Sequence, residues 1–154
     1  MTKILTLCII YDSKRILLEM KKRGFGKDRW NGFGGKVKDN ESIENATYRE
    51  LEEEIGIKAT DAKKRGVLTF SFDGELEKLE VHLFTANKLE GNPAELDKMK
   101  PEWFEHNEIP YPKMWSDGPL WLPPIHKGKN VNGGFHFDSP EGNKIKYYEI
   151  REVI

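Results

Sequence analysis

One segment, GKVKDNESIENATYRELEEEIGI from Gly35 to Ile57, decides how this chain folds. Apolar and small residues recur in it at three- and four-residue intervals, the pattern of an amphipathic helix: Ile43, Ala46, Thr47, Leu51 and Ile55. Ser42 is a suitable N-cap residue for this helix. Gly56 is suited to follow its last residue, because glycine tolerates positive φ. The segment therefore predicts a helix that begins after Ser42 and stops at Gly56.

Two carboxylates lie where this helix should be apolar. At roughly 100° per residue, Glu50 and Glu54 fall within about 40° of each other, on the side of Ile43. Glu53 borders the pair, whereas Glu52 points the opposite way. The helix dipole disfavours acids in the last turns by roughly 0.3–1 kcal/mol each, and Glu50 and Glu54 are a like-charge i,i+4 pair. The arrangement predicts a compensating hard cation, Mg²⁺ with Mn²⁺ as a substitute. A surface helix rich in glutamate is the alternative for the acids alone.

The full spacing of the segment argues against that alternative. Its order is Gly, five residues, Glu, seven residues, Arg-Glu, an aliphatic residue, any residue, Glu-Glu, any residue, Gly and an aliphatic residue. Every defined position of the Nudix hydrolase signature is matched in this register. The chain therefore resembles a Nudix hydrolase. The resemblance implies an α/β fold with a mixed β-sheet sandwiched between helices, in a single Nudix domain over residues 1–154.

Size, charge and cysteine content limit the classes of function. The chain has 154 residues and a net charge of −1, so it has the length of one domain and no overall field that would attract a nucleic acid polymer or an acidic membrane. Cys8 is the only cysteine and lies in an apolar run, which favours a buried reduced thiol over a nucleophile. No signal peptide or transmembrane span is evident. We expect a cytoplasmic monomer that acts on a small-molecule nucleotide.

The rest of the chain reads as strands joined by loops. Strands are expected at residues 4–11, 15–20, 30–37, 66–72, 79–86, 103–104, 135–137 and 146–153. The last two should form a closing hairpin. Loops are expected at residues 21–29 and 93–100, and segment 109–115 is expected to be irregular or to begin a helix.

The resemblance also points to one branch of the family. Beyond the signature it rests on these motifs: MKKRGFG (20–26), RWNGFGGKV (29–37), MKPEWF (99–104), Ile109-Pro110 and Met114-Trp115. They are similar to the MutT-homologue branch, whose members are oxidised purine nucleoside triphosphate diphosphatases that remove 8-oxo-dGTP. The resemblance implies hydrolysis of a nucleoside triphosphate to the monophosphate and pyrophosphate, with Mg²⁺ as the cofactor.

Carried over residue by residue, the signature assigns the phosphate end of the site. Glu50, Glu53 and Glu54 match the metal-binding acids, and the Gly34 carbonyl matches a further ligand. Arg49 and Glu41 match the pair that braces the helix. Metal ions would neutralise phosphate charge while a carboxylate accepts a proton from water. Glu53 and Glu54 are both candidates for that base, and spacing does not choose between them.

The same resemblance assigns the residues that contact the substrate: Thr6, Lys21, Phe25, Asn31, Trp115 and Asp117 around the base, with Gly35 and Lys36 near the phosphates. Phe25 and Trp115 offer flat apolar faces to a purine. Asn31 and Asp117 offer hydrogen-bond partners to its edge. Taken singly, the two aromatic residues would more often be core residues, and an asparagine before a glycine would usually be a turn residue.

Two positions depart from the branch pattern. Where the branch has two adjacent aspartates after the tryptophan, this chain has Asp117 followed by Gly118, and Lys98 replaces an acid before Met99. The first departure keeps open a Nudix pyrophosphatase for another nucleoside diphosphate derivative. A non-catalytic Nudix-fold binding protein is disfavoured, because all the signature acids are retained. Since one ionised carboxylate can accept both donors of a guanine edge, the single Asp117 predicts a preference for 8-oxo-dGTP over oxidised adenine nucleotides.

Overall fold

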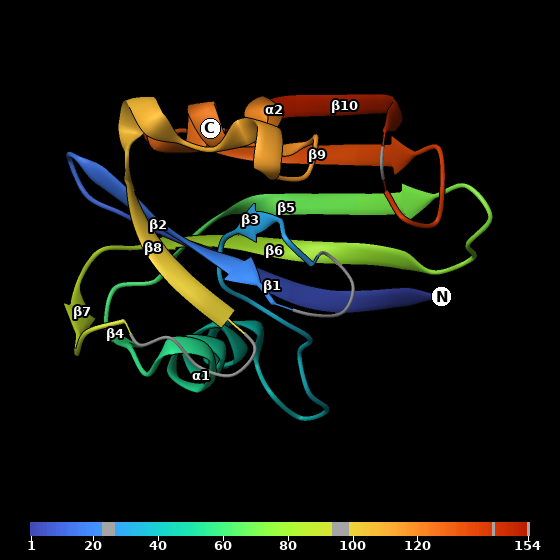
Figure 1. The fold of residues 1–154 in the computed structure, drawn as a ribbon. Coiled ribbons are helices and arrows are strands. Elements are labelled where there is room, and N and C mark those ends of the chain that lie inside the picture. Colours follow the sequence, from blue (N-terminus) through green and yellow to red (C-terminus); the bar gives the residue numbers. More distant parts are fainter. Residues whose placement is uncertain (23–26, 94–98, 143, 154) are drawn as a thin grey trace.

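Most of the chain belongs to one mixed β-sheet. The computed structural model describes residues 1–22, 27–93, 99–142 and 144–153. The elements are β1 (Thr2–Tyr11), β2 (Arg15–Lys21), β3 (Trp30–Asn31), α1 (Ile43–Ile55), β4 (Lys58–Ala59), β5 (Lys63–Phe72), β6 (Lys78–Ala86), β7 (Leu89–Glu90), β8 (Met99–Glu105), α2 (Gly118–His126), β9 (Asn130–Phe137) and β10 (Ile145–Val153), with short 3₁₀ turns at His106–Glu108 and Tyr111–Lys113. Within the described residues, eight strands form the sheet, in the order β10-β9-β5-β6-β1-β2-β3 with β8 also paired to β2 (Figure 1). β4 and β7 form a separate two-stranded ribbon.

The sheet contains both strand directions, which confirms the predicted fold class. β1 runs parallel to β6, and β5 runs parallel to β9. The pairs β1–β2, β5–β6 and β9–β10 are antiparallel, and the last is the predicted closing hairpin. Parallel neighbours lie far apart in the sequence because each pair needs a long crossover connection.

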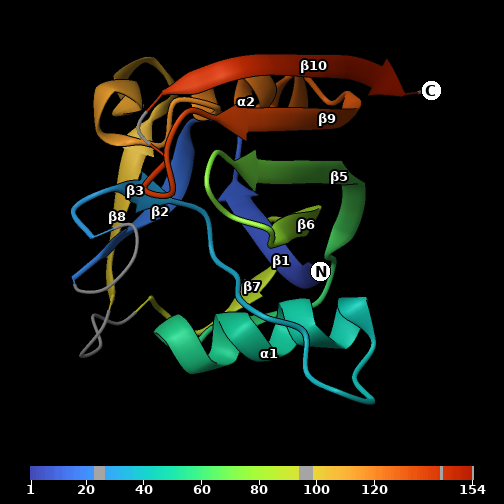
Figure 2. The same cartoon turned by 90° about the vertical axis from the view of Figure 1, so that its right-hand side faces the viewer.

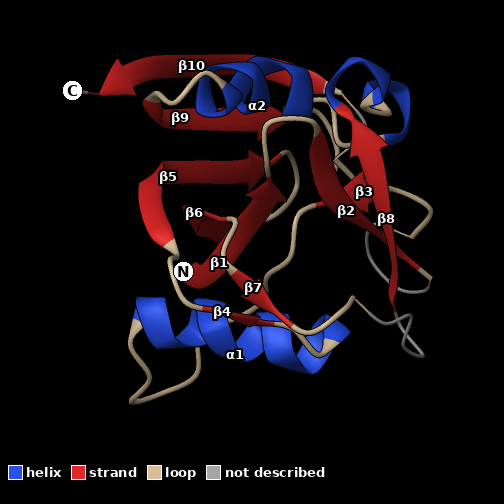
Figure 3. Ribbon diagram, turned by 90° about the vertical axis from the view of Figure 1, so that its left-hand side faces the viewer, coloured by secondary structure: helices blue, strands red, loops and turns tan. Residues whose placement is uncertain are grey.

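The two helices cover opposite faces of this sheet, and each face has its own core. Cys8 and Ile10 on β1 pack with Leu51 and Ile55 of α1. Ile9 points the other way and packs in the cluster that contains Trp121 of α2. Successive side chains of a strand point to opposite faces, so the two clusters must lie on the two sides of the sheet. Figures 2 and 3 show α1 below the strands and α2 at the top. Neither described helix is long and apolar enough to cross a bilayer.

Helix α1 has the ends that the sequence predicts. The Ser42 hydroxyl accepts a hydrogen bond from the Asn45 N–H at 3.0 Å, which satisfies one of the free donors of the first turn. Gly56 follows the helix with φ of 69°, and its N–H donates to the Glu52 carbonyl at 3.0 Å. These two caps fix the length of the helix and hence the positions of its glutamates.

Three parts of the structure differ from the sequence prediction. Segment 30–37 is not one strand: β3 ends at Asn31, and the chain then continues beside β1 through isolated bridges. A Cβ on Gly34 would collide with the carbonyl of Thr6, so this close approach requires glycine. Residues 99–100 begin β8 rather than ending a loop. Helix α2 was not predicted, because Pro123 and Pro124 lie inside it and proline normally interrupts a helix.

The divergence of β1 from β2 creates the space for a site. The two strands pair only at the two positions next to the turn that joins them. Farther along, segment 33–36 takes the place of β2 beside β1, with a bridge between Cys8 and Phe33. This arrangement places Gly34 against β1 and Gly35 against Glu50 of α1, and it leaves an opening between β1 and β2.

Candidate active site

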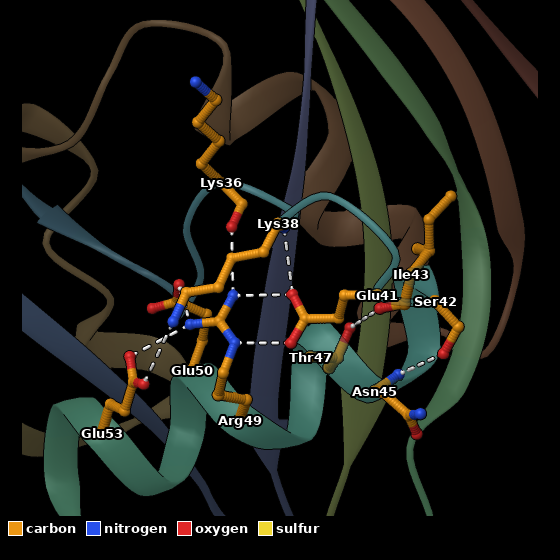
Figure 4. A network of polar contacts seen from close by, with 10 residues as sticks. All are labelled: Lys36, Lys38, Glu41, Ser42, Ile43, Asn45, Thr47, Arg49, Glu50 and Glu53. Carbon is orange, nitrogen blue, oxygen red and sulfur yellow. Dashed lines mark hydrogen bonds and ion pairs between the residues drawn. The ribbon is translucent and has the colours of Figure 1, made fainter.

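A cavity of about 300 Å³ lies in this opening. Its lining includes seven residues that the sequence prediction assigns to the site: Thr6, Lys21, Asn31, Gly34, Gly35, Trp115 and Asp117. They come from β1, β2, β3, the glycine segment and the chain before α2. Phe25 lies outside the described residues. Lys36 does not line the cavity; its side chain is exposed and extends away from the glutamates, while its carbonyl faces Arg49 (Figure 4).

Arg49 lies at the centre of the signature residues (Figure 4). Its Nε donates to Glu41 Oε2 at 2.6 Å, and its Nη2 donates to Glu41 Oε1 at 2.9 Å. Its Nη1 donates to Glu50 Oε1 at 2.9 Å and to Glu53 Oε2 at 3.0 Å. Nη2 also donates to the Lys36 carbonyl at 3.1 Å. One planar guanidinium thus ties the helix to the preceding loop and fixes two of the acids.

The arginine also controls the charge of Glu41. Hydrogen bonds from Arg49 and then from the Lys38 N–H lower the pKa of Glu41 to about 2. The same contacts raise the pKa of Arg49, with the hydrogen bond to Glu41 as the main cause. The pair is therefore ionised over the whole physiological pH range, and its geometry does not change with pH there.

Glu54 and Glu19 form a second, more deeply buried pair. Glu19 comes from β2, is only 5% exposed and lines the cavity. Burial, together with contacts to Glu19 and Glu50, raises the pKa of Glu54. Burial likewise raises the pKa of Glu19, against a hydrogen bond with Glu54 that lowers it. Two adjacent buried carboxyl groups of this kind hold a proton between them unless a cation replaces it.

The acids fit a hard divalent cation. Glu54 Oε2 and Glu19 Oε2 are buried and have no hydrogen-bond partner within the described protein. Such orphaned carboxylate oxygens are the donors that Mg²⁺ and Mn²⁺ prefer. The Glu50 carboxylate packs on Gly35, where a Cβ would lie 2.6 Å from Glu50 Oε1, so the glycine lets the chain approach this group. In the described ranges, no three acid, imidazole or thiol side chains are already assembled as a metal cluster.

The opposite end of the cavity is aromatic and contains one buried acid. Phe72 and Phe137 stack with centroids 5.4 Å apart, and Phe137 meets Trp115 edge-on at 6.1 Å. Asp117 is 5% exposed, and its Oδ2 accepts a hydrogen bond from Trp121 Nε1 at 2.7 Å. Burial raises the pKa of Asp117, and the Trp121 hydrogen bond partly offsets this. A flat apolar slot beside a carboxylate suits the edge of a planar ring.

Asn31 and Thr6 stand between the two ends. The Asn31 side-chain oxygen accepts the Gly32 N–H at 2.9 Å, so this residue does make the local turn contact that its sequence context suggests. Its amide nitrogen can still donate to a ligand. The Thr6 hydroxyl is buried and has no partner among the described residues, whereas its backbone N–H donates to the Gly35 carbonyl at 2.9 Å.

Sequence reasoning missed several residues of the cavity. Glu19 carried a usable signal, because it is a charged residue between the apolar residues Leu18 and Met20 in the middle of a strand. Phe72 and Phe137 gave only the alternation of a buried strand, which indicates a core rather than a ligand. Arg29 gave no signal; it lines the cavity, and its guanidinium carbon lies 4.0 Å from the centroid of the Trp115 ring.

A second cavity of about 560 Å³ lies near the far end of β1, and none of the described residues predicted for the site lines it. The signature acids do not line the first cavity directly either; Gly35, which does, is in contact with Glu50. His106 and His126 meet there, with ring centroids 3.6 Å apart and Nε2 atoms 3.2 Å apart. Burial, and then the neighbouring His106, lower the pKa of His126. Neither histidine is among the residues that the sequence prediction assigns to the site.

Comparisons with known proteins agree with this geometry. The family model described as NUDIX domain matches residues 1–123. An oxidized purine nucleoside triphosphate hydrolase of Danio rerio is 48% identical over 136 residues, covering 88% of this chain and 87% of that protein. One of Mus musculus is 41% identical over 152 residues, covering 99% and 96%. A crystal structure of a MutT protein from Bacillus halodurans superposes with a TM-score of 0.83 at 25% identity, covering 96% of this chain and 97% of that chain.

Proposed function

Because the chain belongs to the Nudix family of hydrolases, we propose that it converts oxidised purine nucleoside triphosphates, such as 8-oxo-dGTP, to the monophosphate and pyrophosphate. The observation that carries the proposal is the pairing of two unlike ends in one cavity. Glu19 and Gly35 border one end, and the Glu50 carboxylate packs against Gly35 there. Trp115 and Asp117 line the other end. The two oxidized purine nucleoside triphosphate hydrolases cover 88% and 99% of this chain, which supports the same substrate class.

At the phosphate end, the signature acids hold the cofactor and accept the proton. Glu50, Glu53 and Glu54, with the Gly34 carbonyl, are the proposed ligands of Mg²⁺, for which Mn²⁺ can substitute. When bound, the ion neutralises phosphate charge and favours attack by water. Arg49 orients Glu50 and Glu53 through its hydrogen bonds. Glu53 or Glu54 accepts the proton of the attacking water.

At the base end, the cavity holds the purine flat and reads its edge. Trp115 provides a stacking surface, and Asn31 and Asp117 face the base edge. A carboxylate has two oxygens with about four acceptor sites, so the contact with Trp121 leaves Asp117 able to accept both donors of guanine. An adenine edge presents an acceptor beside a donor and leaves one group unpaired, which costs roughly 1–3 kcal/mol. We therefore propose that 8-oxo-dGTP is preferred to 8-oxo-dATP by about tenfold or more.

We also propose the bounds of the functional domain, its cellular compartment and its oligomeric state. β9 and β10 belong to the same sheet as β1 and β2, which line the cavity, so the functional domain would extend over residues 1–154. Cys8 is fully buried and burial raises its pKa to about 12, which suits an inert thiol in a reducing cytoplasm. We propose that the protein acts there as a monomer on small nucleotides, and sedimentation analysis would test the monomer.

A panel assay tests the proposed function. The nucleotide products are measured by chromatography after incubation with Mg²⁺ for 8-oxo-dGTP, 8-oxo-dATP, dGTP, a sugar nucleotide, a dinucleoside polyphosphate and capped RNA. We expect the highest kcat/KM for 8-oxo-dGTP. The Glu54→Gln variant serves as the control for contaminating phosphatases, because it should lose the activity. A higher kcat/KM for the sugar nucleotide, the dinucleotide or the capped RNA would overturn the proposal.

A further inference from the structure

Arg29 occupies a position at the base end that the signature does not include. Trp30 forms a parallel bridge with Met114, which holds the two segments side by side. The Arg29 side chain reaches Trp115 on the neighbouring segment, although the two residues lie far apart in the sequence. The guanidinium lies over the indole ring at 4.0 Å, and both side chains line the cavity. This is the geometry of a cation–π contact.

The stacked guanidinium constrains the indole. Trp115 also packs against Gly142, where a Cβ would collide with the ring, and against the edge of Phe137. With Arg29 over its face, the ring is held on several sides. A planar guanidinium can stack on an aromatic ring, whereas an ammonium cannot. The plane on which a base would stack is thus set in part by Arg29.

Arg29 also supplies positive charge near the buried acid. Burial raises the pKa of Asp117, and the charge of Arg29 acts in the opposite direction. The other charged side chains of the cavity lining are Glu19 and Lys21, which both belong to β2. Removal of Arg29 would therefore favour the protonated form of Asp117. A protonated carboxyl group can donate to the acceptor of an adenine edge, whereas the ionised form matches the two donors of guanine.

We propose that Arg29 is a positioning and specificity-determining residue of the base cavity, acting through Trp115 and Asp117 to favour guanine-type over adenine-type bases. The inference rests on the proposed function for the identity of the ligand. It adds a residue and a direction of selectivity that the signature acids do not determine.

Equilibrium binding of 8-oxo-dGMP and 8-oxo-dAMP, followed by calorimetry between pH 5 and pH 8, tests this role without hydrolysis. In Arg29→Gln we expect the Kd for 8-oxo-dGMP to rise about tenfold and the preference over 8-oxo-dAMP to fall by a similar factor. The loss of 8-oxo-dGMP affinity at low pH, which we call the acid limb of binding, should begin at a higher pH in this variant. Arg29→Lys retains the charge but not the stack, so its Kd should rise while its acid limb stays in place.

Arg15 provides a matched control. Its guanidinium carbon lies 4.1 Å from the centroid of Trp103, and neither residue lines the cavity. Arg15→Gln removes an equivalent cation–π contact and should leave the binding of both nucleotides and the pH profile unchanged. Thermal unfolding of each variant reports on the fold.

Two results would overturn the inference. The first is an unchanged guanine preference and acid limb in Arg29→Gln, and the second is a wild-type protein that binds neither monophosphate. Failure of the proposed function is a separate outcome: the wild-type protein would bind 8-oxo-dGMP with the predicted dependence on Arg29 but would not hydrolyse 8-oxo-dGTP.

Discussion

Arg49→Lys should impair catalysis although it retains the positive charge. In the structure the guanidinium makes five hydrogen bonds, to both oxygens of Glu41, to Glu50, to Glu53 and to the Lys36 carbonyl. A single ammonium has three donors that point away from one nitrogen, so it cannot serve both sides of the network at these distances. Glu50 and Glu53 would lose a shared support.

The size of the effect follows from the role of that support. Loss of a residue that orients metal-binding groups typically costs 10- to 100-fold in activity. That factor corresponds to about 1.4–2.7 kcal/mol of activation free energy. The Arg49 side chain is 19% exposed, so water screens the charge only in part and the contacts retain most of their orienting effect. We therefore expect kcat to fall 10- to 100-fold while the protein remains folded.

Steady-state hydrolysis of 8-oxo-dGTP at saturating Mg²⁺ measures this effect, with thermal unfolding as the check on the fold. Arg151→Lys is the matched control, because Arg151 pairs with Glu149 at 3.1 Å on the surface and both side chains are more than 70% exposed. That variant should retain wild-type kcat. Near wild-type turnover in Arg49→Lys would show that charge alone is sufficient and that the planar fork does not position the acids.

Three further predictions follow from the site. Glu53→Gln and Glu54→Gln should each lower kcat by orders of magnitude, and a chelator should abolish wild-type activity; full turnover in excess chelator would contradict the metal assignment. Asp117→Asn should weaken 8-oxo-dGTP recognition, and Gly118→Asp should recover activity on 8-oxo-dATP. A Cβ at position 118 would meet Met114, whose flexible Cε is the nearest atom at 3.2 Å. Measurement of kcat/KM for both substrates checks both variants. The pKa of His126 lies below its usual value of 6.5, so the unfolded state binds its proton more readily. Stability should thus decline as the pH falls from about 7 to 5, and thermal melts of His126→Gln should show a weaker decline.

The arrangement of the signature residues was predictable because these residues are close together in the sequence. Arg49, Glu50, Glu53 and Glu54 lie within one helix, and helical periodicity alone places two acids on the covered face. The caps at Ser42 and Gly56 are also local signals, and both are confirmed. The contact between Arg49 and Glu41 spans only eight residues. For residues within one helix, the spacing in the sequence nearly determines how the side chains are arranged in space.

The residues that lie outside helix α1 were less predictable, because they meet only through the order of the strands. Glu19 reaches Glu54 because β2 diverges from β1, and nothing in the sequence of β2 specifies that divergence. Arg29 reaches Trp115 through the bridge between Trp30 and Met114, which joins two segments of no shared pattern. Helix α2, which carries Trp121, contains prolines that argue against a helix on local grounds.

This difference between the signature residues and the rest of the site has a consequence for how specificity can change. Glu50 and Glu53 are tied to one another through Arg49, so under the proposed function a substitution among the acids should alter the hydrolysis of every substrate. The base end draws on β2, β3, β5, β9 and the chain before α2, and its members do not share such a hub. This chain has Gly118 where the branch pattern has a second aspartate, and Asp117 still accepts its hydrogen bond from Trp121. Selectivity for the base can therefore vary at single positions while the hydrolytic machinery remains unchanged, and Arg29 and Gly118 are the positions where this chain should show it.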